Sequence, residues 1–140
     1  MPYFVIHAAG NDGAIEFAVE TAAKGEFLWY RQEWNQAYVR RLAREVFDEM
    51  ASPEIDAGWK GFDEPPRETN RRLPAVKRMM RNCAALTRAL LPDEVKAIMF
   101  SGEVRLMLLV TLSLHFIPWE LLADRDAFLV ERSEVMKVIL

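Results

Sequence analysis

The sequence has little of what metal-binding and disulfide-stabilised proteins need. Its 140 residues include one cysteine, Cys83, and two histidines, His7 and His115. A single cysteine cannot form a disulfide within the chain, and these three side chains cannot complete a Cys/His zinc site. The first residues lack the charged and apolar segments of a signal peptide. We therefore predict a cytoplasmic protein that uses no metal or other cofactor.

The sequence also lacks an apolar run that could cross a membrane, which takes about 18 residues or more. Lys and Arg total 18 and Asp and Glu total 21, so the net charge is −3, and nothing overall favours nucleic acid or an anionic membrane. The hydrophobic fraction of 51% excludes a disordered chain. The length fits one domain of about 100–200 residues.

The N-terminal part predicts an antiparallel β-hairpin. Residues 3–8 are rich in strand-forming side chains, and in residues 14–21 apolar and polar positions alternate. Between them, Gly10 and Gly13 flank Asn11 and Asp12, and residues of these types tolerate the positive φ of a tight turn.

Three helices are predicted after the hairpin. Apolar residues recur at helical spacing over residues 31–50 and 73–91, and a short helix over residues 93–100 begins with two acidic residues. A stretch rich in proline and glycine, residues 52–70, separates the first two helices. Three aromatic residues, Trp29, Tyr30 and Trp34, lie at the boundary between the loop and the first helix. We expect them to pack under the hairpin, and a ligand or partner patch is the alternative.

The C-terminal part predicts three strands. Residues 106–110 form an uninterrupted apolar run, typical of a parallel strand buried on both faces. Residues 128–132 and 135–140 follow as further strands. We predict an α/β fold in two segments: residues 1–70 with the hairpin, a helix and the Pro/Gly-rich loop, and residues 71–140 with the beginning of a mostly parallel sheet.

Residues 106–138, LMLLVTLSLHFIPWELLADRDAFLVERSEVMKV, resemble the opening of a CHAT domain, a family of caspase-like cysteine peptidases. The resemblance extends over about residues 83–138. A Thr-Leu-Ser stretch, residues 111–113, stands where the family usually has a Pro-Asp-Gly turn. The residues that match the family motifs are Pro118, Trp119, Glu120, Leu121, Leu122, Leu129, Val130, Glu131 and Arg132.

The resemblance implies an incomplete caspase-like three-layer sandwich, with a hairpin and two main helices ahead of the first core strands. In the family, a catalytic histidine and cysteine lie downstream of these strands, which would place both beyond Leu140. The parent would cleave peptide bonds of a protein or peptide substrate and could have tetratricopeptide-repeat partners. This chain would be the truncated N-terminal portion of such a hydrolase and inactive alone, so no catalytic residue is carried over to it.

The motif residues and the three reactive side chains all have structural interpretations. Pro118 presets a short helix, Trp119 anchors a loop against the sheet, and Glu120 lies favourably in a first helical turn. We expect Cys83 to be a core residue on an apolar helix stripe, His7 to end a strand, and His115 to bond to backbone or face water.

Two non-enzymatic alternatives remain open. The apolar strand at residues 135–140 could dock a partner by strand addition, which would make the chain a protein–protein interaction module. Residues 67–88 carry a net charge of +6 and could bind a polyanion. The acidic stretch at residues 45–64 favours pairing of the two segments within the chain instead, so nucleic acid is not the expected partner.

Overall fold

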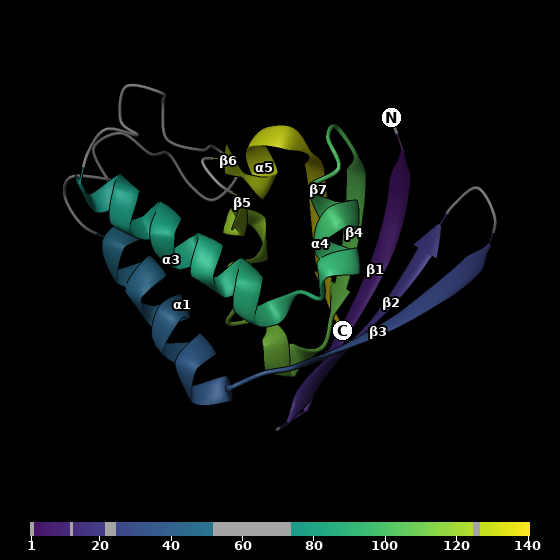
Figure 1. Ribbon diagram of the computed structural model, residues 1–140, viewed down its shortest axis with the longest axis horizontal. Coiled ribbons are helices and arrows are strands. Elements are labelled where there is room, and N and C mark those ends of the chain that lie inside the picture. Colours follow the sequence, from purple (N-terminus) through teal and green to yellow (C-terminus); the bar gives the residue numbers. More distant parts are fainter. Residues whose placement is uncertain (1, 12, 22–24, 52–73, 125–126) are drawn as a thin grey trace.

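Five strands form one mixed β-sheet in a computed structural model of the chain (Figure 1). The model describes residues 2–11, 13–21, 25–51, 74–124 and 127–140. The order across the sheet is β3-β2-β1-β4-β7; the first three strands pair antiparallel, and β1, β4 and β7 pair parallel. The mixed α/β class is confirmed. The strands are β1 (Tyr3–Gly10), β2 (Ala14–Thr21), β3 (Glu26–Glu33), β4 (Arg105–Val110) and β7 (Glu134–Ile139).

Two long helices and several short elements connect these strands. The predicted second and third helices are confirmed to within one residue at each end. None of the helices in the described part of the chain is long and apolar enough to span a bilayer. A small antiparallel ribbon, β5 with β6, lies outside the main sheet. The elements are α1 (Gln36–Met50), α3 (Pro74–Leu90), α4 (Asp93–Met99), η2 (Leu112–Leu114), η3 (Trp119–Leu121), β5 (Ala123–Asp124), β6 (Ala127–Phe128) and α5 (Leu129–Arg132).

The hydrophobic core lies on one face of the sheet. Helices α1 and α3 pack side by side there, and the described helices α1, α3, α4 and α5 all contribute side chains to the same buried cluster (Figure 1). Its largest fully buried side chains include Trp119, Phe17 and Phe128. Strands of both predicted segments share this core, because β1 pairs directly with β4. A second helical layer, which the three-layer expectation needs, is not present among the described residues.

The opposite face of the sheet, which we call the open face, has no described helix over it. Its side chains follow from the strand registers, because directly paired residues point to the same face. Several are well exposed, with Trp29 at 72% and Met136 at 59%. The open face consists of Tyr3, Val5, His7, Ala9, Glu16, Ala18, Glu20, Phe27, Trp29, Arg31, Arg105, Met107, Leu109, Glu134, Met136 and Val138.

The predicted hairpin is confirmed, but its turn uses different chemistry. The side-chain Oδ1 of Asn11 accepts the backbone N–H groups of Gly13 and Ala14, both at 2.9 Å, which closes the turn. Neither Gly10 nor Gly13 has a positive φ. At Gly10 space matters instead, because a Cβ there would lie 2.5 Å from Cδ2 of Leu114 and would force that side chain to shift. Leu114 therefore packs directly on the carboxyl end of β1.

The prediction of a helix beginning at residue 31 was wrong over its first five residues. Strand β3 runs to Glu33 and pairs along its whole length with β2. The helix begins only at Gln36, where Oδ1 of Asn35 accepts the backbone N–H of Tyr38 at 3.0 Å as an N-cap. The three aromatic residues within positions 27–30 are the sequence signal for the third strand, and Gly25, just before the strand, has a positive φ.

Two further predictions about strands were wrong. Strand β4 is not buried on both faces, because its buried positions alternate with half-buried ones that belong to the open face. Of the predicted strand at residues 128–132, only Phe128 lies in a strand, β6, and residues 129–132 form a single helical turn, α5. Its geometry is local: Oε1 of Glu131 accepts the N–H of Phe128 at 3.1 Å, and the N–H of Ser133 bonds to the carbonyl of Leu129 at 3.1 Å. The strand at residues 135–140 is confirmed as β7.

A buried hydroxyl joins α3 to the ribbon. The side-chain oxygen of Thr87, which is fully buried, donates to the carbonyl oxygen of Cys83 at 2.9 Å and accepts the N–H of Ala123 at 3.0 Å. Both bonds are made away from water, where an unpaired polar group is costly. Thr87 thus fixes the chain that leaves η3 against the long helix.

Replacing Thr87 by Val is expected to lower the free energy of unfolding by about 1–3 kcal/mol, because the N–H of Ala123 is left buried without a partner. Urea denaturation followed by circular dichroism measures the change. Thr87→Ser keeps the hydroxyl and is the matched control, with a smaller expected loss. Equal losses for the two variants would contradict the role assigned to the hydroxyl.

Candidate functional site

The residues that match the family motif form the connection from β4 toward β7. As predicted, Pro118 precedes a short 3₁₀ helix, η3. Trp119 is 1% exposed, and its indole Nε1 donates to the carbonyl oxygen of Leu114 at 3.1 Å. Leu121 and Leu122 are fully buried in the core. The segment is therefore a packed corner that holds the chain against one face of the sheet.

Glu120 links this corner to the outermost parallel strand. Its Oε1 lies 3.1 Å from Nζ of Lys137 on β7, and its Oε2 lies 3.4 Å from the same nitrogen. Both side chains are at most 22% exposed, so solvent screens this pair less than a surface pair. Lys137 points to the core side of the sheet, where η3 lies. The ion pair thus fixes the position of β7 relative to the motif.

The second matched segment, Leu129–Arg132, is the helical turn α5 that leads into β7. Leu129 is fully buried and Val130 packs against the core. Glu131 closes the turn through the bond to Phe128 described above. Each of these contacts supports the backbone, and none presents a reactive group to solvent.

The candidate catalytic side chains lie apart from one another. The Cys83 thiol is fully buried on α3 in the core, and burial raises its pKa far above the usual range, so a thiolate is disfavoured. His7 lies on the open face, on the other side of the sheet from the core, with its ring 6.2 Å from that of Phe27. The sheet therefore separates Cys83 from His7, and the core role predicted for Cys83 is confirmed.

His115 follows η2 and is exposed. Its Nδ1 lies 2.9 Å from the carbonyl oxygen of Leu112, as the prediction of a backbone bond required. Ser113 Oγ lies 3.1 Å from Oγ1 of Thr111, and Thr111 also accepts the N–H of Gly10 at 3.4 Å. These contacts tie the turn after β4 to the end of β1.

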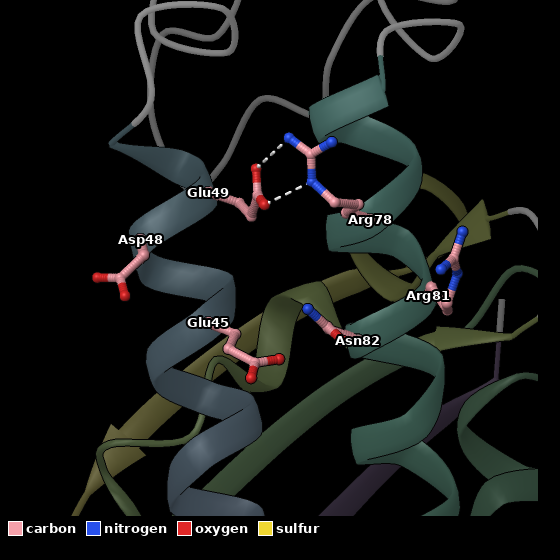
Figure 2. A pocket seen from close by; sticks show the side chains of 6 residues that line it. All are labelled: Glu45, Asp48, Glu49, Arg78, Arg81 and Asn82. Carbon is pink, nitrogen blue, oxygen red and sulfur yellow. Dashed lines mark hydrogen bonds and ion pairs between the residues drawn. The ribbon is translucent and has the colours of Figure 1, made fainter.

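A polar groove lies between α1 and α3 (Figure 2). Its volume is about 430 Å³. Glu49 and Arg78 close one end with a bidentate ion pair, with Oε1 at 2.8 Å from Nε and Oε2 at 3.3 Å from Nη2. Glu45 and Asn82 face each other farther along, whereas the side chains of Asp48 and Arg81 point away from the groove (Figure 2).

The polar side chains that line the groove belong to the contact between α1 and α3, and Glu49 and Arg78 pair across it. Within the described residues, no three His, Cys, Asp or Glu side chains gather closely enough to hold a metal ion. The ion pair supports the pairing of the acidic and basic segments within the chain. The part of those segments that falls in residues 52–73, with Arg67, Arg71 and Arg72, lies outside the described residues.

The three aromatic residues before α1 have separate positions. Trp34 donates from Nε1 to the carbonyl of Asn11 at 2.9 Å and stacks on Phe116, with centroids 6.5 Å apart. Tyr30 is half-buried against the core. Trp29 is 72% exposed on the open face, so the expectation that it packs under the hairpin was wrong.

Sequence comparison adds no relative: the chain matches no protein-family model, and no curated protein matches it significantly.

Replacing Glu120 by Gln is expected to lower the free energy of unfolding by about 1–3 kcal/mol, between the values for exposed and for buried pairs. The change leaves the ammonium of Lys137 partly buried without a counter-ion. Hydrogen exchange of the β7 amides is expected to accelerate in this variant.

The matched control is Glu134→Gln on the same strand. Glu134 pairs with Arg105 at 2.9 Å, but the side chains are 64% and 57% exposed, so the expected loss is under about 1 kcal/mol. If the two variants changed β7 exchange equally, Glu120 would have no special role in positioning that strand.

Proposed function

We propose that this chain is a framework segment of a CHAT-like, caspase-like cysteine peptidase. It would supply the sheet and the Pro118–Leu122 corner, and would not supply the nucleophile. The observation that carries this proposal is the ion pair from Glu120 to Lys137, because it gives the family-like motif a specific task. The motif holds β7 at the edge of the sheet, where further parallel strands of a parent enzyme would add.

The chemistry of the parent would be attack of a thiolate on a peptide carbonyl, with an imidazole as base and acid. Within the described residues no cysteine and histidine are placed for this, since Cys83 is buried and the sheet separates it from His7. The segment alone is therefore inactive in this proposal, and a protein or peptide is the substrate of the parent. The unpaired, buried thiol fits a reducing cytoplasmic location.

Reading the coding DNA beyond the Leu140 codon tests this proposal. The expected result is an open frame that encodes apolar strands, a His-Gly pair and a later cysteine. A stop codon at once would overturn it. As a biochemical check, the purified 140-residue chain is expected to hydrolyse no peptide, and thiol-dependent hydrolysis abolished by Cys83→Ala would contradict its inactivity.

A second candidate function is docking of a partner strand at β7, and the outer edge of β7 favours it. The N–H groups of Glu134 and Leu140 bond to the carbonyls of Val104 and Val110 on the β4 side. Since alternate residues of a strand point the same way, the N–H groups of residues 135, 137 and 139 point outward. Ile139 and Leu140 are 43% and 66% exposed, so this edge offers both backbone groups and apolar surface.

Ile139→Pro is expected to reduce strand addition at β7, because proline removes an outward N–H and leaves the inward bonds in place. Multi-angle light scattering over a concentration series measures self-association through this edge. Leu112→Ala is the control, since Leu112 is 65% exposed but lies outside the sheet. If the unmodified chain and both variants are all monomeric over the concentration series, strand addition at the edge of β7 is contradicted.

A further inference from the structure

The open face holds a shallow hollow with an unusual lining. The hollow has a volume of about 310 Å³ and lies over β1, β2 and β3. Phe27 and Trp29 stack at 6.3 Å between centroids and form its aromatic wall, and the His7 ring lies against Phe27. Ala18 lies between His7 and Trp29 in the register, and its small side chain leaves the space open. The wall is exposed, with Trp29 at 72% and Phe27 at 48%.

The charge at this hollow is negative. Glu16 lines it, and Glu20 lies four residues farther along β2 on the same face. Among the described residues, neither carboxylate takes part in an ion pair. Arg31 is the cross-strand neighbour of Glu16, but it does not line the hollow. A ligand that covered the face without a cation would leave these carboxylates desolvated and unpaired, which is costly.

The backbone of the sheet limits what can cover the face. The N–H and C=O groups of β1, β2 and β4 are used between neighbouring strands, so the face offers an incoming chain almost only side chains. An occupant must satisfy its own backbone hydrogen bonds, which an α-helix does within itself. The distance across the sheet from β1 to β3 is about 10 Å, since neighbouring strands lie ~4.8 Å apart. This width is close to the diameter of one α-helix with its side chains.

We propose that the open face docks an amphipathic α-helix of a partner protein that places a basic side chain in this hollow. The apolar stripe of the helix covers Val5, Met107 and their neighbours on the face. The alkyl part of an arginine or lysine lies on Phe27 and Trp29, and its cationic group meets Glu16. Packing of the alkyl part against apolar rings and charge-assisted bonds of the cationic group to a carboxylate both favour this arrangement. This inference does not depend on the peptidase proposal, because it uses no motif residue.

Two synthetic helical peptides of about 20 residues test the proposal, a length at which isolated helices persist in water. Both carry the same leucine stripe, and one has arginine where the other has glutamate beside the stripe. Fluorescence anisotropy of labelled peptide measures binding to the 140-residue chain. The arginine peptide is expected to bind at least about tenfold more tightly, and its affinity to fall as salt is added.

Variants assign the binding to the hollow. Trp29→Ala is expected to weaken binding of the arginine peptide by about tenfold or more, as for an aromatic hot spot. Glu16→Gln is expected to remove most of the preference for arginine over glutamate. Leu112→Ala, an exposed leucine away from the face, is expected to change neither, and circular dichroism confirms that each variant is folded.

Three outcomes would overturn the proposal. They are equal affinity for the two peptides, no effect of Trp29→Ala in a folded variant, and no binding of the arginine peptide at millimolar concentration. Light scattering adds a fourth. If the chain forms dimers that Trp29→Ala dissociates, a second copy covers the face and the partner helix is wrong.

Discussion

The pairing of β1 with β4 is the constraint on which the rest of the structure depends. The first strand lies at the centre of the sheet, with its sequence neighbour β2 antiparallel on one side and β4, about a hundred residues later, parallel on the other. The long helices between them must then lie over one face to return the chain. Because α1 and α3 lie together on that face, one side of the sheet becomes the core and the other stays open.

The resulting asymmetry explains where the described groups can act. The thiol of Cys83 is on the covered side and inaccessible, and Leu114 packs against the carboxyl end of β1. The motif corner around Trp119 is used for packing, and Glu120 for holding β7. What remains available is surface: the outer edge of β7 and the open face with its aromatic hollow. The strand-addition proposal rests on the backbone groups of the first, and the helix-docking proposal on the side chains of the second.

Local sequence patterns predicted most of the helices and strands. The predictions failed where one local pattern is compatible with both a helix and a strand. The helix over Pro74–Leu90 was predicted closely because a long amphipathic stripe has one interpretation. Residues 31–33 were predicted to begin a helix, but they continue the strand that pairs with β2. At residues 128–132, apolar side chains favoured a strand, but the bond from Phe128 to Glu131 closes a helical turn. Such contacts are specific to one conformation and have no periodic signature.

The sequence by itself determined that the chain is α/β, that it begins with a hairpin, and that Cys83 lies on an apolar helix face. These properties depend on the spacing of apolar residues along one element, which the sequence contains directly. The tertiary structure decided which strands are neighbours, that the motif glutamate meets Lys137, and that Trp29 is exposed while Trp119 is buried. The physical reason is that a periodic pattern identifies an apolar face but not the element that covers it, because that depends on contacts between residues far apart in the chain.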